Sequence, residues 1–173
     1  MSRNLSLLRL SVAIACVAAA FGALSGVASA SSSKTSFALK IESVSVTTGG
    51  KTVKHDLLVN GAGHAVYLLT GDSTKHPECA TATCLGDWPA VTSSAKSPAL
   101  GKGVSGKVAV WHHNGINQLT INGHPLYTYL ADSSAGEATG NGLKSFGGTW
   151  WVLSGAGAEV ALKSGSSSSG SGW

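Results

Sequence analysis

The feature that most constrains this chain is an internal repeat. Residues 62–73, AGHAVYLLTGDS, recur as NGHPLYTYLADS at residues 122–133, at a constant offset of 60 positions (122 minus 62). A polar loop follows each copy, and then a Trp that begins an apolar run, at residues 87–91 and 149–153. The chain is therefore expected to contain two copies of one structural unit related by a pseudo-twofold axis. The residues shared in register are Gly63 and Gly123, His64 and His124, Tyr67 and Tyr127, Asp72 and Asp132, and Ser73 and Ser133.

Short strand patterns separated by tight turns surround the repeat. Hydrophobic and polar residues alternate at residues 53–59 and 108–112, which is typical of half-buried strands. The alternation changes phase between Ile41 and Val44, which predicts a bulge near Ser43. Turns that need positive backbone angles are expected at Gly49–Gly50, Asn114–Gly115 and Asn122–Gly123.

The pattern as a whole predicts an all-β domain. No window has a sustained helical period, and only a single helical turn is expected, around residues 80–85. The expected architecture is a small antiparallel sheet domain, arranged as a meander, a sandwich or a barrel-like sheet. Two long connections, at residues 72–107 and 131–148, occupy the same place in each repeat. Long loops on a rigid sheet are the usual place for binding.

A Tyr-x-aromatic-x-x-Asp pattern marks both copies. The second copy meets it in full, and the first has Leu69 where the aromatic residue is expected. The motif residues are Tyr67, Asp72, Tyr127, Tyr129 and Asp132. Over residues 57–155 the chain resembles the bacterial secreted repeat family, also described as YxxxxD lipoproteins. The resemblance implies a tandem pair of repeats in an exported protein, and it implies no particular activity because the function of the family is unknown.

The first thirty residues have the order of an export signal. Arg3 and Arg9 accompany an apolar run at residues 10–24, and residues 28–30, Ala-Ser-Ala, form a small-residue cleavage site. We expect cleavage there and therefore a secreted or cell-envelope location. Lipidation at Cys16 and an uncleaved membrane anchor are the alternatives.

The remaining chain is expected to form one domain with polar ends. A flexible leader at residues 31–36 precedes a single β domain at residues 37–163, and a disordered Ser/Gly-rich tail occupies residues 164–173. Inside the domain, repeat one covers about residues 53–91 and repeat two about residues 108–153.

The charge of the mature chain argues against nucleic acid as a partner. Cleavage removes both arginines, so 12 minus 2 leaves ten basic residues against 8 acidic ones, and the net charge of about +2 is dispersed. No later segment is apolar for long enough to span a bilayer, so a soluble mature chain without a transmembrane helix is expected. An envelope component, a glycan or a protein remains as the partner class.

The two cysteines of the mature chain are expected to form a disulfide. Cys79 and Cys84 lie close together in a chain destined for an oxidising compartment. The first repeat of the family also carries two cysteines shortly before a Trp-Pro pair, which the segment from Cys79 to Pro89 resembles. Metal ligation by the two thiolates is the alternative.

The paired aspartates and tyrosines are the first candidates for a site. Each Asp ends a strand and precedes Ser, so we expect Asp72 and Asp132 to accept hydrogen bonds from the backbone two residues on. The hydroxyls of Tyr67 and Tyr127 would need a polar partner, for which the Asp of the other repeat is a candidate. Catalysis of glycan hydrolysis by the two carboxylates is the alternative interpretation.

Histidines and tryptophans supply the remaining candidates. His64, His124, His112 and His113 are the candidate ligands if a metal or haem is bound, although no motif specifies either group and no cofactor is predicted. Trp88, Trp150 and Trp151 are candidate binding residues, because an exposed Trp beside polar loops can stack on a sugar or contact a protein. Trp150 and Trp151 are adjacent on a strand, so one should face the core and the other the surface.

The sequence favours a non-enzymatic binding module. No Gly-x-Ser-x-Gly, phosphate-loop or His-Glu-x-x-His motif is present. We therefore expect an exported module that binds a ligand or partner through its paired long loops. The alternatives are a metal- or haem-binding redox accessory protein and, with less support, a glycan-processing enzyme.

Overall fold

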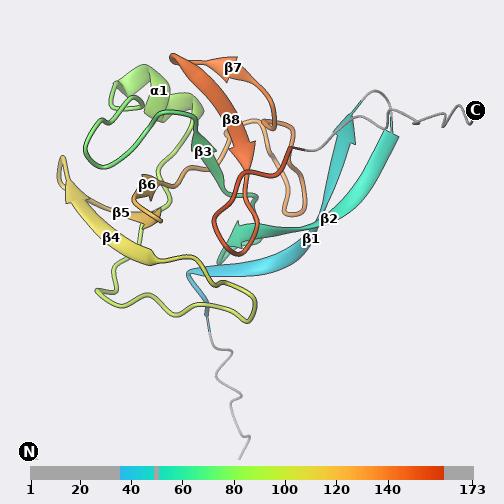
Figure 1. Ribbon diagram of the computed structural model, residues 1–173, viewed down its shortest axis with the longest axis horizontal. Helices are drawn as coiled ribbons and strands as arrows, with labels where there is room; N and C mark the ends of the chain where they lie inside the picture. Colours follow the sequence, from blue (N-terminus) through green and yellow to red (C-terminus); the bar gives the residue numbers. More distant parts are fainter. Residues whose placement is uncertain (1–35, 49–50, 162–173) are drawn as a thin grey trace, which may run out of the picture. The chain divides into compact units, whose positions relative to one another are not determined.

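The computed structural model describes residues 36–48 and 51–161, and its strands form three small antiparallel sheets (Figure 1). The strands are β1 (Leu39–Thr48), β2 (Lys51–Asn60), β3 (Tyr67–Leu69), β4 (Val108–His113), β5 (Ile116–Ile121), β6 (His124–Pro125), β7 (Lys144–Ser145) and β8 (Gly148–Val152). The sheet orders are β1-β2, β3-β8-β7 and β4-β5-β6. The all-β expectation is confirmed, and the sheets do not close into a barrel. The expected signal, leader, Gly49–Gly50 turn and tail lie outside the described residues, except for Ser36 at the end of the leader.

The first hairpin corrects the expected bulge. β1 and β2 pair in one unbroken register from Leu39↔Asn60 to Thr48↔Lys51, so no extra residue is inserted near Ser43. The hairpin is buried on both faces at different points along its length. Leu39 and Leu58 belong to one core cluster, whereas Val44 and Leu57 belong to another. The change of hydrophobic phase therefore reflects a change of partner and not a bulge.

Two of the predicted turns form as expected. Asn114 and Gly115 connect β4 to β5 with φ angles of 45° and 76°, and Asn122 and Gly123 connect β5 to β6 with φ angles of 53° and 87°. Asn and Gly tolerate this left-handed region better than other residues do, and two-residue hairpins require it.

The pairing between the two repeats differs from a simple meander. β3 of repeat one pairs with β8 of repeat two, with Leu69 opposite Trp150. In return, the Trp88 segment of repeat one lies beside residues 126–130 of repeat two: Val91 N–H donates to the Leu126 carbonyl (2.9 Å) and Leu130 N–H to the Asp87 carbonyl (2.9 Å). In each repeat, the segment that carries the motif tyrosine is therefore paired with the Trp-containing segment of the other repeat.

Equivalent hydrogen bonds support the pseudo-twofold relation. Tyr67 N–H donates to the Tyr127 carbonyl (2.8 Å), and Tyr127 N–H donates to the Tyr67 carbonyl (3.0 Å). A second equivalent pair joins Leu58 N–H to the Leu153 carbonyl (2.8 Å) and Leu119 N–H to the Val91 carbonyl (2.7 Å). The two repeats thus share one hydrogen-bonded centre.

An aromatic stack occupies the core between the repeats. The ring of Trp88 lies between Trp150, at 3.8 Å between centroids, and Tyr129, at 4.3 Å. Tyr67 meets Trp88 edge-on, and Tyr127 meets Trp150 edge-on, both at 5.3 Å. Such stacked and edge-to-face contacts add stability beyond the area that the rings bury.

A short helix and a disulfide hold the loop ahead of Trp88. Helix α1 (Ala82–Asp87) confirms the single helical turn expected near this position, and Thr81 caps it by accepting a hydrogen bond from Cys84 N–H (3.2 Å). The expected Cys79–Cys84 disulfide is present, with the two Cα atoms 5.5 Å apart. Because Trp88 N–H donates to the Cys84 carbonyl (2.8 Å), the disulfide also fixes the start of the aromatic stack.

A pair of glycine variants tests how tightly the aromatic stack is packed. A Cβ added at Gly140 would lie 2.7 Å from the Trp88 ring and 3.0 Å from Tyr129, whereas a Cβ at Gly86 in α1 would meet nothing within 4 Å. We expect Gly140→Ala to lower the free energy of unfolding by about 1–3 kcal/mol through overpacking. Gly86→Ala should raise it by about 0.4–1 kcal/mol, because it restricts the unfolded chain. Urea denaturation of both variants checks this, and equal effects would contradict the packing.

Candidate functional site

The motif tyrosines and aspartates form two crossed pairs. The Tyr67 hydroxyl donates to Asp132 Oδ2 (2.6 Å), and the Tyr127 hydroxyl donates to Asp72 Oδ2 (2.7 Å). All four side chains are buried. Each tyrosine therefore bonds to the aspartate of the other repeat, the partner that the sequence had left as one candidate.

The aspartates also close the long loops, over a longer range than expected. Asp72 Oδ1 accepts from Glu78 N–H (3.0 Å), six residues on. Asp132 Oδ1 accepts from the N–H (2.8 Å) and the hydroxyl (2.6 Å) of Thr139, seven residues on. The expectation of bonds to the backbone two residues on was wrong, because the carboxylates point inward to the tyrosines and not along the turn.

Burial affects the protonation of Asp72, Tyr67 and Tyr127. It raises the pKa of Asp72 above its ordinary value, against the lowering effect of the hydrogen bonds from Glu78 and Tyr127. Burial also raises the pKa of Tyr67 and of Tyr127 far above 10.0, and the nearby carboxylates raise both pKa values further. The two tyrosines consequently remain protonated donors throughout the range in which unfolded tyrosines ionise.

The raised tyrosine pKa values predict loss of stability in alkali. Unfolded tyrosines release protons above pH 10, whereas folded Tyr67 and Tyr127 keep theirs, so their contribution is present below pH 10 and is lost as pH rises. Between pH 9 and pH 11 the free energy of unfolding should fall by about 1.4 kcal/mol in total for each tyrosine, with most of the loss above pH 10. Urea denaturation between pH 9 and pH 11 should therefore give a Tyr67→Phe variant about half the slope of the unmodified chain. Identical slopes would show that Tyr67 ionises in the fold.

A surface pocket lies beside the aromatic stack. Its volume is about 570 Å³, and both long connections line it. The first connection supplies Asp87 and Trp88, and the second supplies Ala131 and residues 143–146; Tyr129 and Leu130 complete the wall. The two connections expected to carry binding thus meet at one hollow.

The rim of the pocket is apolar and exposed. Leu130 is 67% exposed and Leu143 is 39% exposed, so two large aliphatic side chains face solvent at its mouth. Lys144 and Asp87 are the charged residues of the lining. These residues were not among the site candidates predicted from the sequence. The one available signal was Leu143, the first large apolar residue of its glycine-rich loop.

Phe146 reaches the pocket through a strained turn. It has a φ of 50°, and Gly147 follows with a φ of 83°, in the hairpin that joins β7 to β8. A bulky aromatic residue in this region costs of order 1–3 kcal/mol, and such strain tends to occur at functional sites. In this strained turn, Phe146 packs against the core on one side and lines the pocket on the other.

The tryptophan candidates are placed mainly in the core. Trp88 and Trp150 are buried, so neither presents an exposed ring for stacking, although Trp88 contributes to the lining of the pocket. The cause is the exchange of strands between the repeats, which stacks the two Trp rings on each other in the core. Trp151 is half-buried opposite Leu68, as expected for the neighbour that faces away from Trp150.

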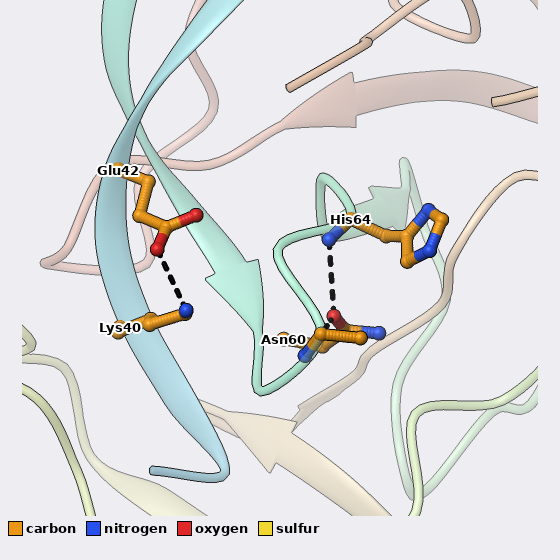
Figure 2. A network of polar contacts seen from close by, with 5 residues as sticks. Lys40, Glu42, Asn60 and His64 are labelled. Atoms are coloured by element: carbon orange, nitrogen blue, oxygen red, sulfur yellow. Dashed lines mark hydrogen bonds and ion pairs between the residues drawn. The ribbon is translucent and has the colours of Figure 1, made fainter. Parts of the chain in front are cut away.

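The histidine candidates lie apart and have local partners. His64 N–H donates to Asn60 Oδ1 (3.1 Å), and Figure 2 shows its ring pointing away from the nearby Lys40–Glu42 ion pair. His124 Nδ1 bonds to the Asp72 carbonyl (2.7 Å). On β4, the other two histidines bond across the hairpin, His112 to Asn117 (2.6 Å) and His113 to Gln118 (2.7 Å).

The described residues do not assemble a metal site from these candidates. Across residues 36–48 and 51–161, no three or more His, Cys, Asp or Glu side chains are grouped so that they could hold a metal ion. Within the same ranges, no helix has the length and apolar character needed to cross a membrane.

Fold and site together define an all-β tandem-repeat protein with one disulfide, centred on crossed Tyr–Asp pairs. Residues 108–154 match the family model described as a secreted repeat of unknown function, so the chain carries a repeat of that family. This match confirms the family expected from the Tyr-x-aromatic-x-x-Asp pattern. No curated protein and no solved structure matches the chain.

Proposed function

We propose that this protein is an exported, non-enzymatic binding module of the cell envelope or extracellular space. Its ligand site is the pocket of about 570 Å³ between the two long connections, and this pocket is the observation that carries the proposal. The family description as a secreted repeat supports the location.

The lining of the pocket favours an apolar ligand group. Trp88 has Trp150 on one face and Tyr129 on the other, so it offers no free ring face for stacking on a sugar. Leu130 and Leu143 instead present aliphatic surface at the mouth. An aromatic or aliphatic group carrying one charge fits best, because Lys144 and Asp87 can each pair with an opposite charge.

A non-enzymatic role is supported by the state of the paired carboxylates. Asp72 and Asp132 are buried, and each accepts hydrogen bonds on both of its oxygens from the protein itself. A general acid or base must instead reach the proton that it transfers to or from a substrate.

The probe 8-anilinonaphthalene-1-sulfonate tests the site, since it combines aromatic rings with one anionic group. We expect its fluorescence to rise saturably on binding to the unmodified chain, and its affinity to fall at least tenfold in a Leu130→Asp variant. Val53→Asp is the matched control, because Val53 is also exposed and does not line the pocket. Equal binding by all three proteins would refute the pocket as the site.

A further inference from the structure

β4 forms a free edge of the third sheet. In the order β4-β5-β6 it is the outer strand, and Figure 1 shows the β4–β5 hairpin with no labelled strand beyond β4. Among the described residues, no backbone group pairs with β4 on the side away from β5.

The direction of the free backbone groups follows from the register. Residues of β4 alternate between bonding to β5 and pointing outward. Asn122 N–H donates to the Lys107 carbonyl (2.9 Å), so the odd-numbered positions in this register bond to β5. Leu119, opposite Val110, donates its own N–H to the Val91 carbonyl (2.7 Å) on the far side, as this parity requires. The N–H and C=O groups of Val108, Val110 and His112 therefore face outward.

This edge lacks the usual protection against strand addition. Edge strands are commonly guarded by Pro, an inserted bulge, a central charge or a covering segment. β4 has the sequence VAVWHH and a continuous register with β5. The outer edge of β1 differs, because Leu39 and Ser45 bond there to Gly101 and Gly136.

A second pocket lies next to the free edge. It has a volume of about 560 Å³, and Ala109, Val110 and Trp111 form its apolar wall. A strand added to β4 would alternate its side chains between the two faces of the sheet, so every second side chain would project on the face of this pocket. The pocket can thus take an apolar side chain of an added strand.

Charge selects the occupant of this edge. Residues 107–123 contain one Lys and two His and no Asp or Glu, and Lys107 is the charged residue of the pocket lining. A second copy pairing antiparallel about Val110 would bring Lys107 of one chain towards His113 of the other and would offer Lys107 no carboxylate. An acidic strand instead complements the edge.

We propose that β4 binds an extended acidic peptide segment of a partner protein by adding it as a fourth strand to the β4-β5-β6 sheet. The backbone groups of Val108, Val110 and His112 provide the pairing. Lys107 selects carboxylates, and the pocket beside Trp111 takes an apolar side chain. This site is separate from the pocket between the long connections, and neither depends on the other.

Amide-resolved NMR titration tests the proposal with an acetylated eight-residue peptide of alternating Val and Glu that has one central Phe. We expect saturable shifts of the Val108, Val110 and His112 amides, and binding at least tenfold weaker for the same peptide with Lys in place of Glu. Val110→Pro should abolish the shifts, because it removes an outward N–H that β5 does not use. Val110→Thr keeps the N–H and should bind like the unmodified chain.

Lys107→Glu provides a variant that leaves the backbone intact, and it should reverse the preference between the Glu and Lys peptides. The proposal is overturned if the β4 amides do not shift at about 2 mM peptide, a concentration that reveals even millimolar dissociation constants. It is also overturned if Val110→Pro binds normally, or if the free protein self-associates through these same amides.

Discussion

Replacing Trp88 by alanine should lower the free energy of unfolding by about 3–5 kcal/mol, the range for removal of a large buried aromatic side chain. The side chain is buried between Trp150 and Tyr129, so its removal leaves a cavity between these two rings. Urea denaturation followed by far-ultraviolet circular dichroism measures the loss.

Trp111→Ala is the matched control for this experiment. Trp111 is half-buried on β4 and stacks on His113, with 3.6 Å between the ring centroids. Its removal should cost about 1 kcal/mol, because the site can fill with water and neighbouring side chains. A larger loss of stability for Trp111→Ala than for Trp88→Ala would contradict the claim that the Trp88 stack is the centre of the core.

Replacing Asp132 by alanine should cost about 3 kcal/mol. The change leaves the Tyr67 hydroxyl, the Thr139 N–H and the Thr139 hydroxyl without their acceptor inside the protein. A buried donor that loses its partner keeps the desolvation cost and loses the bond. Asp132→Asn should cost less, because the amide oxygen can still accept from part of this set. Urea denaturation compares both variants with the unmodified chain.

Glu137 offers a control acid in the same loop. Its carboxylate accepts from Ser134 N–H (3.0 Å) and from the Ser133 hydroxyl (3.3 Å) in exposed positions. Glu137→Ala should therefore change the free energy of unfolding by less than about 1 kcal/mol. Comparable losses for Glu137→Ala and Asp132→Ala would show that the buried hydrogen bonds of Asp132 stabilise the fold no more than the exposed ones of Glu137 do.

Local chemistry made part of the fold predictable from the sequence. Asn114–Gly115 and Asn122–Gly123 specify two-residue hairpins because few other residue pairs tolerate the required φ angles. The spacing of Cys79 and Cys84, in a chain expected to be exported, similarly indicated the disulfide. These features depend on a few neighbouring residues, so long-range packing does not override them.

Pairing between the repeats could not be predicted, because both copies carry the same groups. Tyr67 could bond to Asp72 of its own repeat or to Asp132 of the other, and the motif is identical in both cases. Only the packing of Trp150 against β3 and of Trp88 against residues 126–130 decides for the crossed arrangement. The apolar rim of the pocket was missed for a related reason, since Leu130 and Leu143 lie in irregular segments without a period to read.

A double-mutant cycle shows whether each motif tyrosine bonds to the aspartate of the other repeat. Tyr67→Phe combined with Asp132→Ala should show a coupling energy of about 1.5–3 kcal/mol, the range for a hydrogen bond to a charged group. Tyr67→Phe combined with Asp72→Ala should show coupling below about 0.5 kcal/mol, the limit for groups that share no partner. Strong coupling of Tyr67 to Asp72, with none to Asp132, would mean that each repeat closes on itself and would contradict the structure described here.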